Sequence, residues 1–128
     1  MESVIKKMKF KSVGVIINAP SYIYIESEFL KNGFTSTFDV NVKSTNTLVF
    51  LKSKSEFINF LTDPIKNVAY DSVLWFAYPK GTSKIKTDIN RDILSVVANE
   101  YGLDTVTAVS IDETWSGLRF RPIEKVGK

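Results

Sequence analysis

A loop rich in hydrogen-bond donors carries the first candidate chemistry. Lys80 closely follows residues 72–78, an apolar run that predicts a buried strand, and Thr82 lies two residues further on. Ligands of open α/β sheets bind beyond the carboxyl ends of such strands. The lysine ammonium and the threonine hydroxyl could therefore hold an anionic ligand. The alternative is a solvated loop lysine, with Pro79 and Gly81 present only to shape the turn.

Two charged residues near the start of the next predicted helix form a second candidate group. With Thr87 as the N-cap, Asp88 and Arg91 are three residues apart, so they share a helix face and could form an ion pair. Arg91 could instead join Lys80 around a carboxylate or phosphate through its bidentate guanidinium. The alternative is a cap with a surface salt bridge, which contributes less than about 1 kcal/mol.

The third group brackets a short connection between two predicted strands. Asp112 and Trp115 lie in the connection, and Arg119 lies in the strand that follows. The indole could cap a pocket or stack on the Arg119 guanidinium. Equally, Trp115 could close the edge of the core while Asp112 fixes the turn and pairs with Arg119. The candidate ligand-binding residues are therefore Lys80, Thr82, Asp88, Arg91, Asp112, Trp115 and Arg119.

The composition excludes several common chemistries. The 128 residues contain no histidine and no cysteine, so a Ser-His-Asp triad, a thiol nucleophile, a disulfide and a zinc finger are impossible. No two carboxylates have a spacing typical of acid–base catalysis or of metal binding. We therefore expect no metal site and no cofactor, and a binding protein rather than an enzyme.

The charge pattern argues against two classes of partner. The net charge is +3, and residues 1–11 alone account for it; the other lysines are scattered. Nucleic-acid-binding proteins instead gather basic and aromatic residues on one face. No apolar run approaches the ~18 residues of a membrane span, and the first residues lack the apolar core of a signal peptide. We therefore expect a cytoplasmic protein that binds neither nucleic acid nor membrane, and the oligomeric state stays open.

Apolar patterning predicts alternating strands and helices. Continuous apolar runs are typical of covered strands, alternation of half-covered ones, and spacing at three and four residues of helices. Strands are expected at residues 13–17, 34–40, 48–51, 72–78, 106–111 and 117–121. Helices are expected at residues 22–31, after a capping box formed by Ser53 and Glu56, and from Thr87 to Gly102.

This order predicts an α/β fold, a Rossmann-like three-layer sandwich with a mostly parallel sheet that ends in an antiparallel C-terminal hairpin. No repeat or linker interrupts the sequence, and the length suits one hydrophobic core. We therefore expect a single α/β domain over residues 1–128, with residues 1–10 and 122–128 loosely ordered.

Three motifs carry a resemblance to a known family. They are LWFAYPK at residues 74–80, TDINRD at residues 87–92 and IDETWSGLRF at residues 111–120. Their order resembles a bacterial family of small cytoplasmic proteins classified as a domain of unknown function. Its members have a strand ending in Tyr-Pro-Lys, an Asp-x-x-Arg helix start and a closing Asp-Glu-x-Trp-Ser-x-Leu-Arg-Phe. The resemblance covers residues 72–121 and implies relatedness without an activity.

The element order is also similar to a reduced S-adenosylmethionine-dependent methyltransferase sheet, which would imply a nucleotide-type cofactor. Those enzymes place glycines in the turn after the first strand so that the backbone can approach the cofactor. Here residues 18–22 read NAPSY, without glycine and with a proline that removes one donor. We therefore expect a non-catalytic domain that binds a small anionic ligand or a protein partner. The alternative is a degenerate, methyltransferase-like transferase.

Overall fold

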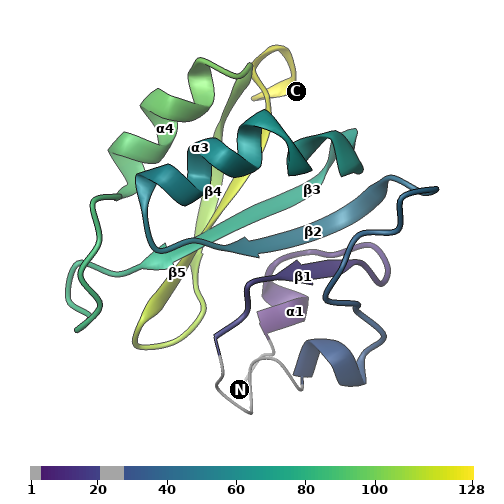
Figure 1. Ribbon diagram of the computed structural model, residues 1–128, viewed down its shortest axis with the longest axis horizontal. Helices are drawn as coiled ribbons and strands as arrows, with labels where there is room; N and C mark the ends of the chain where they lie inside the picture. The colour runs from purple at the N-terminus through teal and green to yellow at the C-terminus, as the bar shows by residue number, and fades with distance from the viewer. Residues whose placement is uncertain (1–3, 21–27) are drawn as a thin grey trace.

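Five strands form one sheet in the order β1-β2-β3-β5-β4 (Figure 1). The computed structural model describes residues 4–20 and 28–128. The strands are β1 (Val15–Ile17), β2 (Ser44–Phe50), β3 (Val68–Pro79), β4 (Leu103–Ser110) and β5 (Trp115–Pro122). β1, β2 and β3 run parallel, whereas β5 is antiparallel to both of its neighbours, β3 and β4. The α/β structure therefore has a mixed sheet.

The predicted Rossmann-like sandwich with a mostly parallel sheet is wrong. The C-terminal hairpin is present, but β5 inserts between β3 and β4, so the antiparallel strand lies inside the sheet rather than extending its edge. The strand expected at residues 34–40 contributes a single bridge, between Thr35 and Val15. Alternation of strands and helices predicts that successive strands run parallel. It does not predict that a later antiparallel strand inserts between two of them.

Two apolar clusters lie on opposite faces of the sheet. Side chains alternate along β3, so Leu74 and Phe76 contribute to one cluster and Trp75 to the other. The helices α3 (Lys54–Thr62) and α4 (Arg91–Asn99) both cover the first cluster. The second cluster is covered by the N-terminal segment, which includes α1 (Val4–Lys7). Figure 1 shows α3 and α4 together on one side, with α1 on the other.

The start of α3 follows the predicted capping box with one difference. The Ser53 hydroxyl accepts the Glu56 N–H at 3.1 Å. The Glu56 carboxylate reaches back to the N–H of Lys52 at 2.8 Å, one residue earlier than the box predicts. A short 3-10 helix, η1 (Pro64–Asn67), follows α3.

The start of α4 lies later than predicted. Its N-cap is Asn90, whose side-chain oxygen accepts the Ile93 N–H at 2.9 Å. Thr87, the predicted cap, donates its hydroxyl to the Lys52 carbonyl at 2.7 Å. Both residues are good caps by type, and the contact with Lys52 holds Thr87 outside the helix.

The two segments for which the sequence predicted loose order, residues 1–10 and 122–128, include described residues that contact the sheet. Met8 is fully buried, and its carbonyl accepts the Trp75 indole N–H at 2.9 Å. After β5 the chain forms a 3-10 turn, η2 (Ile123–Lys125). Residues 1–3 lie outside the described part.

The helix expected at residues 22–31 can be compared with the structure only at its end. Residues 28–31 are helical, and residues 21–27 lie outside the described part of the chain. Across residues 4–20 and 28–128, no helix has the length and apolar character needed to cross a membrane.

Candidate functional site

Lys80 lies directly after β3, where the sequence predicts it, and it holds the neighbouring hairpin. Its ammonium donates to the Ser110 hydroxyl at 2.6 Å, and its N–H donates to the Thr114 carbonyl at 2.7 Å. Thr82 is exposed on the loop that follows. The lysine therefore ties the end of β3 to the β4–β5 connection.

Asp88 and Arg91 do not form the predicted pair. The Asp88 carboxylate accepts the Lys54 N–H at 2.7 Å, so it caps the start of α3 from a distant segment. Arg91 is the exposed first residue of α4, and Asp88 precedes that helix instead of sharing its face. Ion pairs among the described residues include Lys66–Asp63 and Arg121–Asp71.

Asp112 and Trp115 shape the turn and the core. One carboxylate oxygen of Asp112 accepts the N–H groups of Thr114 at 2.8 Å and Trp115 at 2.7 Å. Trp115 is 1% exposed and meets the Phe50 ring edge to face at 5.0 Å between centroids. Its indole N–H is buried without a partner among the described residues. Trp115 at the edge of the core and Asp112 in the turn therefore match the structural alternative left open by the sequence. The pair between Asp112 and Arg119, which that alternative also expected, does not fit the strand register.

Arg119 lies away from this group. It pairs with Trp75 in the β3–β5 register, whereas Trp115 pairs with Pro79 at the end of β3. Four residue steps along a strand separate the two positions by about 13 Å. The structure therefore brings Lys80, Asp112 and Trp115 together at the end of β3 but leaves Arg119 further along the sheet.

A cavity that the sequence did not predict lies where the parallel strands end. It has a volume of about 750 Å³ and lies between the end of β1, residues 36–38 and α3. Its apolar lining is formed by Ile17, Phe38, Val49, Leu51, Phe60 and Pro64. The polar lining includes Asn18, Ser36, Thr37, Glu56, Asn59 and Asp63. Ligands of α/β proteins bind beyond this edge of the sheet.

A smaller cavity of about 340 Å³ adjoins the first. The two share Asn18 and Glu56, and the smaller one is also lined by Phe50, Lys52 and Trp115. Asn18 has φ +58°, a left-handed conformation that asparagine tolerates better than most residues. This conformation turns the chain sharply at the end of β1, where the two cavities meet.

The charges that line the larger cavity have one sign. Glu56 and Asp63 both lie on or next to α3, and no lysine or arginine lines the cavity among the described residues. Asp63 pairs with Lys66 at 2.9 Å on an exposed surface. The sequence shows the spacing of Glu56, Asn59 and Asp63 along one helix face, but it does not show that this face meets β1.

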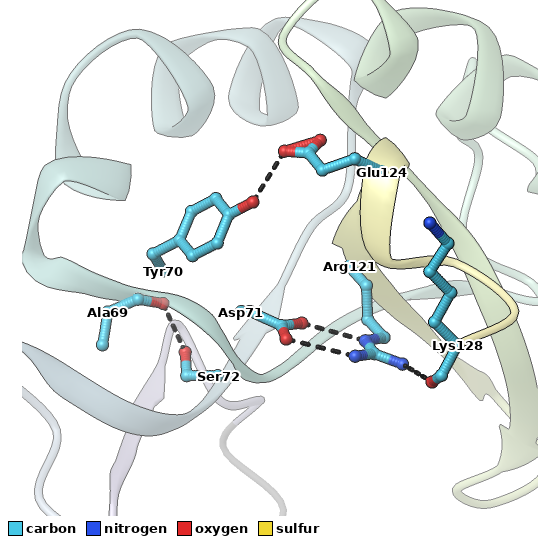
Figure 2. Close-up of polar contacts among 7 residues, drawn as sticks. All are labelled: Ala69, Tyr70, Asp71, Ser72, Arg121, Glu124 and Lys128. Carbon is cyan, nitrogen blue, oxygen red and sulfur yellow. Dashed lines mark hydrogen bonds and ion pairs between the residues drawn. The ribbon is translucent and has the colours of Figure 1, made fainter.

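A second polar cluster lies near the start of β3 (Figure 2). β3 bulges between the pairs Ser44–Val68 and Asn46–Val73, and Asp71 within the bulge has φ +53°. Asp71 accepts two hydrogen bonds from Arg121, at 2.9 and 3.1 Å. This contact with Arg121 lowers the pKa of Asp71.

Tyr70, also in the bulge, donates its hydroxyl to Glu124 at 2.7 Å (Figure 2). The hydrogen bond raises the pKa of Tyr70 and lowers the pKa of Glu124. The bulge is therefore fixed to β5 and η2 by two polar contacts. The sequence reasoning missed this cluster, because a bulge inside a strand leaves no pattern that local spacing reveals.

Comparison with known proteins gives little further information. No family model matches the chain, and no curated protein matches it. A solved structure of a "putative transferase" from Pyrococcus horikoshii is similar at 10% sequence identity with a TM-score of 0.43. The match covers 84% of this chain and 48% of that chain, so this chain spans about half of that protein's length. Similarity at this level establishes neither the fold nor the activity of this chain.

Proposed function

We propose that this chain is a cytoplasmic, non-catalytic domain that binds a small molecule in the cavity between β1 and α3. The observation that carries the proposal is the pair of adjoining cavities, of about 750 and 340 Å³, at the end of the parallel strands. Small-molecule sites are typically concave, mostly apolar and furnished with a few polar groups. The larger cavity has this composition.

The charged lining favours one class of ligand. An anion in the larger cavity would meet the Glu56 carboxylate, whereas a cation would be attracted by it, since Asp63 already pairs with Lys66. Phe38 and Phe60, whose rings lie 6.2 Å apart, offer apolar surface for the body of the ligand. The proposed ligand therefore has an apolar body and a cationic group, in contrast to the anionic ligand that the sequence suggests.

The methyltransferase-like alternative loses its main support. It depended on a mostly parallel sheet, and the sheet is mixed with β5 inserted between β3 and β4. A fold without its characteristic sheet supplies no reason to expect that family's chemistry. The binding proposal depends on the cavities alone.

A titration with two probes of opposite charge tests the proposal. The full chain, labelled with ¹⁵N, is titrated with 2-phenylethylammonium and with 3-phenylpropionate while amide shifts are followed. We expect saturable shifts around Asn18, Glu56 and Asn59, with the cation binding about three- to fivefold more tightly, as one surface charge pair gives. Absence of saturable shifts at this edge, or tighter binding of the anion, would contradict the proposal.

Two matched variants locate the site. Asn59→Trp places a large ring in the cavity, whereas Ser55→Trp places the same ring on an exposed position of α3 outside it. We expect the first variant to abolish binding of 2-phenylethylammonium and the second to leave it unchanged. Glu56→Gln keeps the acceptor for Lys52 but removes the charge, so it should remove most of the preference for the cation.

A further inference from the structure

Two arginines of β5 point to the same face of the sheet. Arg119 and Arg121 are two residues apart, and side chains alternate along a strand. Phe120, between them, packs into the cluster beneath α3 and α4, so both arginines project from the opposite face. They therefore share one environment, close to the bulge of β3.

Arg121 is fully engaged in this environment (Figure 2). Its Nε and Nη2 atoms donate to the two carboxylate oxygens of Asp71, in the bidentate geometry that arginine forms with carboxylates. Its Nη1 atom donates to the main-chain oxygen of Lys128 at 3.1 Å. The arginine is held by three hydrogen bonds and both oxygens of its partner are used.

The Arg119 side chain, in contrast, forms no hydrogen bond and no ion pair with any residue that the structure describes. Its Nε is buried and unpartnered. Burial, followed by the charge of Arg121, lowers the pKa of Arg119, and Asp71 only partly opposes this. A guanidinium carries five N–H donors, and a buried donor without a partner is costly, although Arg119 as a whole is only half-buried. The positive charge of Arg119 is therefore only partly neutralised by the residues around it.

The charges around Arg119 do not balance. Asp71 interacts with three cations, namely Arg119, Arg121 and Lys125. Both of its oxygens accept from Arg121, and the nearby Glu124, which accepts from the neutral Tyr70 hydroxyl, interacts with Lys125. The three cations of this group therefore outnumber its two carboxylates, and Arg119 forms no hydrogen bond to either carboxylate.

The neighbouring strand is irregular opposite Arg119. The β4–β5 register passes from Thr105–Phe120 to Ala108–Leu118, so Val106 and Thr107 both oppose Arg119. Such a bulge leaves a residue outside the regular hydrogen-bond ladder. Thr107 is exposed, so a ligand beside Arg119 would also have a hydroxyl within its surroundings.

We propose that Arg119 is an anion-binding residue that holds a carboxylate or phosphate group of a ligand beside the bulge of β4. The guanidinium fork matches the oxygen spacing of both groups. The Arg121–Asp71 pair positions the site by fixing the neighbouring turn of β3. This site is separate from the cavity between β1 and α3, so it does not depend on the function proposed above.

The three arginines of the chain provide an internal comparison. The Nε–Hε signals of Arg91, Arg119 and Arg121 are followed in the ¹⁵N-labelled full chain during titration with inorganic phosphate and with acetate at constant ionic strength. We expect a saturable shift of the Arg119 signal in the millimolar range, with Arg91 unaffected. A larger response to phosphate than to acetate assigns the phosphate group, and the reverse assigns the carboxylate. No response of Arg119, or equal responses of Arg91 and Arg119, would overturn the proposal.

Matched variants give a second readout. Phosphate or acetate at high concentration should raise the melting temperature of the native chain by mass action. Arg119→Gln should lose this rise, and Arg91→Gln, which removes an exposed arginine, should keep it. Arg119→Lys keeps the charge but not the fork, so we expect an intermediate rise. An unchanged rise in Arg119→Gln would refute the assignment even if that variant is less stable than the native chain.

Discussion

The two ends of β3 use charged residues in different ways. Beyond its carboxyl end, Asp88 caps α3 and Asp112 holds the N–H groups of a turn. Near its start, Asp71 pairs with Arg121 while the buried Nε of Arg119 has no hydrogen-bond partner among the described residues. The comparison shows that carboxylates near a predicted ligand-binding edge can serve as acceptors for backbone N–H groups. Near the start of β3, in contrast, the cationic side chains outnumber the carboxylates, so one of them can take a ligand.

Removal of Trp115 should have the largest effect, because this side chain closes the core at the carboxyl end of β3. We expect Trp115→Ala to lower the free energy of unfolding by about 3–5 kcal/mol, the usual cost of truncating a buried aromatic residue. Urea unfolding followed by circular dichroism measures it. Trp115→Phe keeps a ring against Phe50 and should cost clearly less. A loss below about 1 kcal/mol in the alanine variant would show that the indole does not support the core.

Removal of the Asp88 cap should have an intermediate effect. Asp88→Ala leaves the Lys54 N–H without its acceptor, and loss of a helix cap costs about 1 kcal/mol. Asp88→Asn retains an oxygen acceptor and should recover most of this stability in the same urea experiment. If Asp88→Ala were neutral, the carboxylate would be free for a ligand, and the contrast between the two ends of β3 would fail.

The pH dependence of the Asp71–Arg121 pair should be the smallest effect. Arg121 lowers the pKa of Asp71 below its ordinary value of 3.8, so the folded state favours the ionised carboxylate. The pair therefore stabilises the protein fully above that value, and this stability is lost as the pH falls through the lowered pKa.

Comparison with Asp71→Asn isolates this term, because asparagine also tolerates the left-handed backbone at this position. We expect the native chain to be more stable than the variant at neutral pH, by less than the cap effect, and the difference to shrink as the pH falls below 3.8. A difference that stays constant from neutral pH down to pH 2 would show that the carboxylate charge contributes nothing.

Local features were predicted well where neighbouring residues determine them. Ser53 caps α3 because its hydroxyl reaches an N–H three residues later, which the sequence shows directly. The apolar run at residues 72–78 lies within β3, and the C-terminal hairpin joins β4 to β5. Where two local solutions compete, the prediction failed: Thr87 and Asn90 are both suitable caps, and a contact with Lys52 determines that Asn90 starts α4.

The candidate residues show the same division. The sequence located Lys80 at the end of a strand and Asp112 in a turn, since both follow from local patterns. It could not show that Asp88 accepts the N–H of Lys54, more than thirty residues earlier in the chain. Nor could it show that Arg119 lies four residues along the sheet from the carboxyl end of β3. The cavity between β1 and α3 was missed for the same reason, because its walls come from three separate segments.

The sequence by itself determined the secondary-structure types of most elements, the Ser53 cap of α3, the turn of the final hairpin and the absence of histidine and cysteine chemistry. These depend on residue type and on spacings of a few residues. Only the tertiary structure determined that β5 lies between β3 and β4, which carboxylates serve the backbone and which arginine lacks a partner. Those outcomes depend on contacts between distant segments, whose energies local patterns do not contain.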